Sequence, residues 1–172
     1  MDFLKKILFW QPQKDLLEVL LSKKNGQKYL LFFNYIIWLF FAYLSFKILF
    51  AGLNIFYQLF WATLIAEIIE RIVKKKVAWA RPLLKRKHKI PAGFVKSWYE
   101  AGSFPSGHTI KTFYFFLIIM QFHLFNPILF ILIVLPLLIF RVVMGLHYPI
   151  DMIGGGIIGV IIWLITNIVY VL

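Results

Sequence analysis

The sequence predicts an all-α membrane protein: a polytopic bundle of five transmembrane helices with an N-terminal amphipathic surface arm. Hydrophobic residues make up 62% of the 172 residues and charged residues 15%, whereas a soluble domain has about 45–50% apolar and about 25% charged residues. Five stretches reach or approach the roughly 20 apolar residues that a membrane span needs. The one long polar segment, residues 74–107, is basic and contains several prolines and glycines, which predicts an irregular loop.

Residues 1–28 form the predicted arm. Their leucines, together with Phe3 and Ile7, are spread among six lysines. This pattern is typical of one or two helices that lie on a membrane surface, interrupted near Pro12. Acidic residues and the lack of a long apolar core argue against a cleavable signal peptide.

The rest of the chain, residues 29–172, forms the predicted transmembrane domain. Its spans cover 29–50, 53–73, 109–125, 128–144 and 150–172. Gly52 supplies the first turn, and Asn126 and Pro127 separate the third span from the fourth. Because successive spans alternate in direction, the arm, the 74–107 loop and the turn before residue 150 fall on one face of the membrane. Gly155 and Gly159 have the spacing of closely packed membrane helices.

The net charge limits the partners that the chain can bind, and the cysteine content limits its chemistry. Nineteen Lys and Arg against seven Asp and Glu give a net charge of +12, which requires anionic partners. The apolar composition favours acidic or phosphorylated lipids in a bilayer over nucleic acid. The chain has no cysteine, which excludes disulfides, zinc fingers, thiolate catalysis and iron–sulfur clusters.

Three groups of polar residues stand at span ends on the same face, and we expect them to converge. The first two groups are Lys74 with Arg81-Pro82, and Pro105-Ser106-Gly107-His108; the third is Arg141, His147 and Asp151. Ser106 and Gly107 precede an apolar helix, whose first-turn N–H groups form an anion site. Arginine binds two phosphoryl oxygens at once, and a carboxylate such as Asp151 can fix the tautomer of a nearby histidine.

Each group also has a simpler interpretation. Ser106 and Gly107 are ordinary residues at a helix start, and basic residues at span ends are commonly lipid anchors. Asp151 fits the first turn of any helix, and Glu67 and Glu70 precede Arg71 and Lys74 by four residues, as in helix-face ion pairs. Two histidines and a carboxylate, His108, His147 and Asp151, also form a possible set of metal ligands, which the neighbouring cations disfavour.

Taken together, the three groups resemble the signature motifs of the type-2 phosphatidic acid phosphatase and vanadium haloperoxidase superfamily. The first two groups match at every fixed position. The third lacks the serine that usually precedes its arginine, and Phe140 stands there. Many membrane members have six spans, and here the arm replaces the first.

The resemblance implies a role for each residue. His147 is the nucleophile that forms a phosphohistidine, Asp151 orients it, and His108 is the general acid and then the general base. The resemblance implies no metal and no cofactor. Residues implied to bind the phosphoryl oxygens are Lys74, Arg81, Ser106, Gly107 and Arg141.

The implied activity is that of a lipid phosphatase. Lipid A 1-phosphate and undecaprenyl pyrophosphate are the favoured substrates, and phosphatidylglycerophosphate and phosphatidic acid are alternatives. Two other hypotheses are a vanadate-dependent haloperoxidase, which five apolar spans disfavour, and a non-enzymatic cationic membrane scaffold.

The two arguments on sidedness disagree. Nearly all Lys and Arg lie on the catalytic face, so the positive-inside rule places that face in the cytoplasm. The resemblance to bacterial enzymes implies an inner-membrane protein whose site faces the periplasm. We adopt the periplasmic orientation, because phosphate binding itself accounts for many of these cations.

Overall fold

A computed structural model describes residues 2–11, 24–82 and 102–171. Within these ranges the chain is helical and contains no strand. The helices are α1 (Asp2–Leu8), α3 (Lys24–Ala51), α4 (Leu53–Val77), α7 (Gly107–Gln121), α8 (Pro127–Val143) and α9 (Pro149–Val171).

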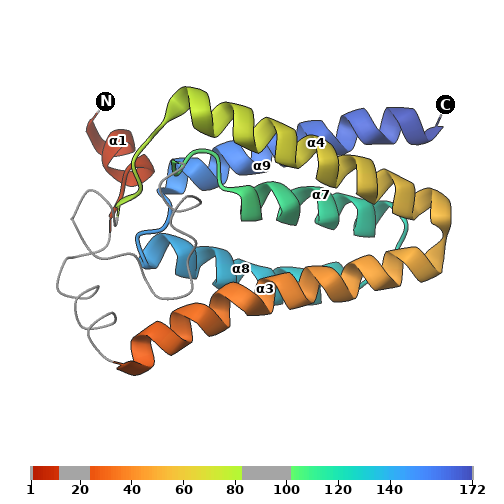
Figure 1. Ribbon diagram of the computed structural model, residues 1–172, viewed down its shortest axis with the longest axis horizontal. Helices are drawn as coiled ribbons and strands as arrows, with labels where there is room; N and C mark the ends of the chain where they lie inside the picture. Colours follow the sequence, from red (N-terminus) through yellow and green to blue (C-terminus); the bar gives the residue numbers. More distant parts are fainter. Residues whose placement is uncertain (1, 12–23, 83–101, 172) are drawn as a thin grey trace.

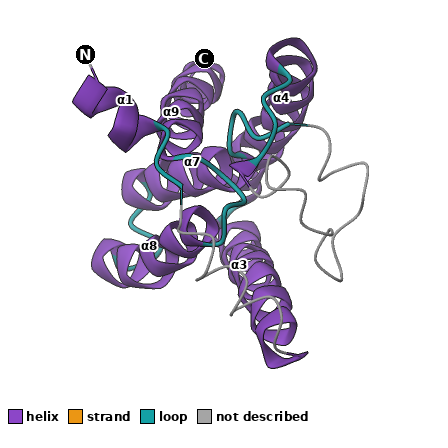
Figure 2. Cartoon of the chain, turned by 90° about the vertical axis from the view of Figure 1, so that its left-hand side faces the viewer, coloured by secondary structure: helices purple, strands orange, loops and turns teal. Residues whose placement is uncertain are grey.

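Helix α7 is the centre of the bundle. It contacts α4, α8 and α9, while α3 contacts α4 and α8, and the end-on view shows α7 surrounded by the other long helices (Figure 2). The end of α4, the start of α7 and the α8–α9 turn lie at one end of the bundle, together with α1 (Figure 1). The predicted convergence of three chain segments therefore exists in the fold.

Local chemistry explains where the helices begin and end. The Asn126 side chain accepts hydrogen bonds from the N–H groups of Ile128 and Leu129, and Pro127 occupies the first turn of α8, as helix starts prefer. Gly145 turns the chain after α8 with φ 67°, a conformation that glycine adopts without steric cost. This turn delivers His147 to the end of the bundle.

Helix α9 packs closely on α7 at glycines. A Cβ added at Gly155 would lie 2.7 Å from the carbonyl oxygen of Ser106, and one at Gly159 would lie 2.6 Å from that of Ile110. Only hydrogen at these positions allows the two backbones to approach so closely. The predicted small-residue packing is confirmed, and it seats the start of α7 against α9.

The bundle is apolar outside and partly charged inside. Leu39, Phe46 and Leu132 are each more than 60% exposed, whereas the site's charged side chains are buried. Leu53–Val77 and Pro149–Ile168 are long and apolar enough to cross a membrane, and Tyr35–Ala51 and Pro127–Val143 are shorter apolar helices.

The helices occur where spans were predicted, but five transmembrane crossings are not confirmed. The third predicted span, α7, has 15 residues and is about 22 Å long, less than the roughly 30 Å of a hydrocarbon core. It is also enclosed by its neighbours rather than by lipid. Helix α3 begins at Lys24, inside the predicted arm, because the same helix continues through the polar residues 24–28 that precede its apolar stretch. Residues 12–23 of the arm and 83–101 of the predicted loop lie outside the described residues.

Candidate active site

All eight residues of the predicted site lie at the same end of the bundle, and all are buried. They come from the last turn of α4 and the segment after it, the start of α7, the last turn of α8, the turn between α8 and α9, and the first turn of α9. The segment before α7 is fastened on both sides: the Ser103 N–H donates to the Trp79 carbonyl at 2.7 Å, and the Ser106 N–H donates to the Asp151 carbonyl at 3.1 Å. The backbone thus joins the three motifs directly.

His147 is held in a defined orientation. Its Nδ1 lies 2.9 Å from the carbonyl oxygen of Ser103, which can only accept, so Nδ1 carries the proton. Arg81 Nη1 donates to His147 Nε2 at 3.2 Å and to the Leu146 carbonyl at 2.8 Å. Because a guanidinium only donates, Nε2 carries the lone pair. His147 therefore presents a nucleophilic nitrogen toward a cation.

The surroundings keep His147 neutral. Burial lowers its pKa well below the usual 6.5, and the positive charges of Arg81, Arg141 and Lys74 lower the pKa further. A neutral imidazole is the form that can attack an electrophile. Two of these cations, Arg81 and Lys74, come from the first motif, and Arg141 comes from the same motif as His147.

Asp151 is near His147 but is not the nearest partner of its Nδ1. Its Oδ2 accepts the Tyr148 N–H at 2.8 Å and lies 3.5 Å from His147 Nδ1, beyond the Ser103 carbonyl. The carboxylate thus fixes the backbone beside His147 and supplies a nearby negative charge, while Ser103 makes the closer hydrogen bond. A backbone carbonyl leaves no signature in the sequence, so this partner was missed.

His108 forms a second histidine–arginine pair. Arg141 Nη2 donates to His108 Nε2 at 2.6 Å, and the Trp38 ring of α3 meets the imidazole edge-on with 5.0 Å between ring centroids. Arg141 is thus buried within the bundle instead of reaching outward as a lipid anchor. The two histidines each direct Nε2 toward an arginine.

The start of α7 is shaped for an anion. Ser106 caps no backbone N–H of the helix; its Oγ instead accepts from Thr109 Oγ1 at 3.0 Å. Gly107 packs directly against the Glu70 carboxylate, where a Cβ would clash. First-turn N–H groups lack intrahelical acceptors and favour negative charge. The Ser106 side chain therefore does not cap the helix, and the Glu70 carboxylate is an anion that already lies at this helix start.

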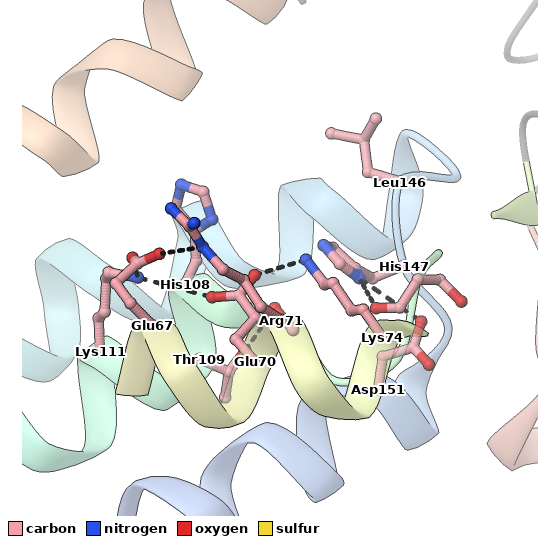
Figure 3. Close-up of polar contacts among 12 residues, drawn as sticks. Glu67, Glu70, Arg71, Lys74, His108, Thr109, Lys111, Leu146, His147 and Asp151 are labelled. Carbon is pink, nitrogen blue, oxygen red and sulfur yellow. Dashed lines mark hydrogen bonds and ion pairs between the residues drawn. The ribbon is translucent and has the colours of Figure 1, made fainter. Parts of the chain in front are cut away.

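Several residues beside the site were not predicted as part of it. Glu70 pairs with Lys74 at 2.5 Å, and Glu67 pairs with Arg71 at 4.0 Å, which confirms both expected helix pairs. Lys111 pairs with Glu67 at 2.7 Å and approaches Glu70 at 3.6 Å (Figure 3). The one sequence signal for Lys111 was a lysine inside an apolar stretch, three residues after His108.

Aromatic contacts attach the N-terminal segment to the site. The Phe9 ring lies 5.6 Å from that of Trp79 and 5.7 Å from that of Tyr148, the neighbour of His147. Phe140, which stands where the related motif has serine, has its ring 4.6 Å from that of Phe33 on α3. Phe140 therefore contributes aromatic packing at this position.

The charge balance of the site favours an anion. Among the residues that the structure describes here, four cations, Lys74, Arg81, Lys111 and Arg141, and two carboxylates, Glu70 and Asp151, are buried. Buried charge is costly unless it is paired, and a bound oxyanion would add negative charge to this cluster. Within the described residues, no three His, Asp or Glu side chains are grouped to hold a metal ion.

A cavity of about 760 Å³ at the far ends of α4 and α9 offers no comparable chemistry. Its lining includes Tyr57, Gln58, Trp61 and Thr166 and contains no histidine, lysine, arginine or carboxylate.

A family model described as the PAP2 superfamily matches residues 55–171. The match covers more than half of the chain and includes all eight site residues. Comparisons with curated proteins and with solved structures return no match.

The cationic cluster predicts binding of a tetrahedral oxyanion. We expect Arg141→Gln to weaken orthovanadate binding at least about tenfold, because a charge-assisted hydrogen bond contributes about 1.5–3 kcal/mol. Isothermal titration calorimetry of the purified protein measures this. The control is Arg71→Gln, which removes a side chain that is 84% exposed. Equal affinity in the Arg141 variant and the wild type would contradict the assignment of an oxyanion site.

Proposed function

Because the chain belongs to the PAP2 superfamily, the type-2 phosphatidic acid phosphatases, it is a hydrolase of phosphate esters, and we propose that it is an integral membrane lipid phosphatase. One observation carries the proposal: two buried histidines each direct Nε2 toward an arginine, within a cluster of buried cations. This arrangement supplies a nucleophile, a proton carrier and a binding site for a phosphoryl group.

The first chemical step transfers the phosphoryl group to His147. Its Nε2 attacks phosphorus while the bond from phosphorus to the leaving oxygen breaks. His108, which takes up a proton at Nε2 once the bound substrate has drawn Arg141 away from it, donates that proton to the leaving oxygen. Nδ1–H remains bonded to the Ser103 carbonyl, and Asp151 offsets the positive charge that develops on the ring. Arg81, Arg141 and Lys74 stabilise the phosphoryl oxygens, where negative charge is spread in the transition state.

The second step releases inorganic phosphate. His108, now neutral, accepts a proton from water, and the resulting hydroxide attacks phosphorus as the bond to His147 Nε2 breaks. The arginine that holds His108 Nε2 in the free protein is displaced toward the phosphoryl oxygens when substrate binds, which frees this nitrogen for proton transfer. Both steps use groups of this chain together with one water molecule.

The surface supports a membrane location and a lipid substrate. Large apolar side chains face outward on α3, α8 and α9, which an aqueous protein avoids. We propose five helices embedded in a bacterial inner membrane, with the short α7 enclosed by the others. A net charge of +12 suits a multiply anionic headgroup, so lipid A 1-phosphate or undecaprenyl pyrophosphate is favoured over phosphatidylglycerophosphate or phosphatidic acid.

Removing the nucleophile should abolish hydrolysis. We expect His147→Asn, which retains a donor toward the Ser103 carbonyl, to lower kcat/KM by at least about 10⁴-fold, because the covalent pathway is lost. Phosphate release from the four candidate lipids, with purified protein in detergent and EDTA, measures this. His123→Asn is the matched control, since His123 lies beyond the far end of α7 with φ 51°, a conformation that asparagine tolerates.

Two results would contradict this mechanism. Near-normal activity of His147→Asn would exclude the histidine nucleophile. Loss of wild-type activity in EDTA, with recovery on adding a divalent metal, would instead support metal chemistry at the histidines.

Sidedness is testable because the chain has no cysteine. We expect Ala80→Cys, at the site end of α4, to react with a membrane-impermeant maleimide in intact spheroplasts. Ala51→Cys, before the other end of α4, should react only after lysis. The reverse pattern would place the site in the cytoplasm, and equal labelling of both before lysis would contradict a membrane-spanning α4.

A further inference from the structure

A row of alternating charges runs from the phosphate site into the bundle between α4 and α7. Lys74 Nζ lies 2.5 Å from Glu70 Oε1, Lys111 Nζ lies 3.6 Å from Glu70 Oε2, and Lys111 Nζ lies 2.7 Å from Glu67 Oε1. These side chains point toward one another across the two helices (Figure 3). Each carboxylate thus lies between two cations, because Glu67 also meets Arg71.

Lys111 is the most unusual member of this row. It is 5% exposed, its Nζ lies 5.5 Å from the centroid of the Trp38 ring, and it stands one helical turn after His108. A buried ammonium costs several kcal/mol before pairing, and an apolar residue of similar size would often be at least as stabilising. Packing alone therefore does not account for a lysine here.

Glu70 links Lys111 to the site. Its carboxylate rests against Gly107, with no room for a Cβ between them, and it is the hydrogen-bond acceptor for Lys74. A shift of this carboxylate would move Lys74. It would also bring negative charge closer to a bound phosphate.

We propose that Lys111 is a positioning residue for phosphate binding: together with Glu67 it holds the Glu70 carboxylate against Gly107, and Glu70 in turn directs Lys74 toward the phosphoryl oxygens. The proposal rests on the phosphatase function proposed above. If Lys111 is removed, the carboxylates of Glu67 and Glu70 lose the ammonium between them, and Lys74 becomes the remaining buried cation beside both. Glu70 then competes with the phosphoryl group for Lys74, and oxyanion affinity falls.

The test measures orthovanadate affinity by calorimetry on the full chain in detergent. Lys111→Met should raise Kd about tenfold or more, the loss expected for a charge-assisted contact. Lys111→Arg, which keeps the charge, should stay within about threefold of wild type. Arg71→Met removes the other cation paired with Glu67, but one that is 84% exposed, and should change Kd less than about twofold.

A double-mutant cycle separates positioning from a general loss of structure. If Lys111 acts through Glu70, the double variant Glu70→Gln/Lys111→Met has a Kd within about twofold of that of Glu70→Gln alone. The inference is overturned if Lys111→Met binds vanadate as tightly as the wild type does, or if Lys111→Arg weakens binding as much as Lys111→Met. It is also overturned if the fold increases in Kd caused by Lys111→Met and by Glu70→Gln multiply in the double variant.

The outcomes also separate this inference from the proposed function. Wild-type protein that binds vanadate but releases no phosphate from any lipid overturns the lipid phosphatase proposal, while the role of Lys111 is still decided by Kd. Wild-type protein that binds no vanadate overturns both.

Discussion

The burial of several charged side chains in an otherwise apolar bundle is the constraint on which the rest of the structure depends. In the described part of the chain, four cations and two carboxylates are buried near one end of the helices, and such an arrangement persists only if every charge has partners. The backbone supplies part of this compensation: the Leu146 carbonyl accepts from Arg81, and the Ser103 carbonyl meets the His147 ring. Under the proposed function, the phosphoryl group of the substrate adds negative charge to this cluster when it binds.

The packing of α7 makes this arrangement possible. Glycines 155 and 159 bring α9 against its backbone, and Gly107 brings the Glu70 side chain of α4 against its first turn. The helix N-terminus, the cations of α4 and the histidine before α9 therefore meet without long connecting side chains. Catalytic groups held by backbone contacts need little reorganisation when the substrate binds.

Sequence patterns predicted the helical fold and the meeting of three motifs well. Spacing placed Lys74, His108 and His147 at span ends, and alternation of direction placed those ends together. The patterns could not predict the Ser103 carbonyl as the partner of His147, because every residue carries a carbonyl and only tertiary geometry selects one. Nor could they show that α7 is short and enclosed, since apolar residues facing protein and those facing lipid are chemically alike. Lys111 was overlooked because its partners lie on another helix, more than 40 positions away in the sequence.

The central claim is that His147 carries the phosphoryl group during turnover, and trapping that intermediate tests it most directly. A lipid substrate labelled with ³²P in the transferred phosphoryl group is mixed with enzyme, quenched in alkali within milliseconds and digested for peptide mapping. The account predicts alkali-stable label on the peptide that contains His147, lost in acid as expected for phosphohistidine, and absent from His147→Asn. Label on a different residue, or a burst of product without any protein-bound phosphate, would contradict it.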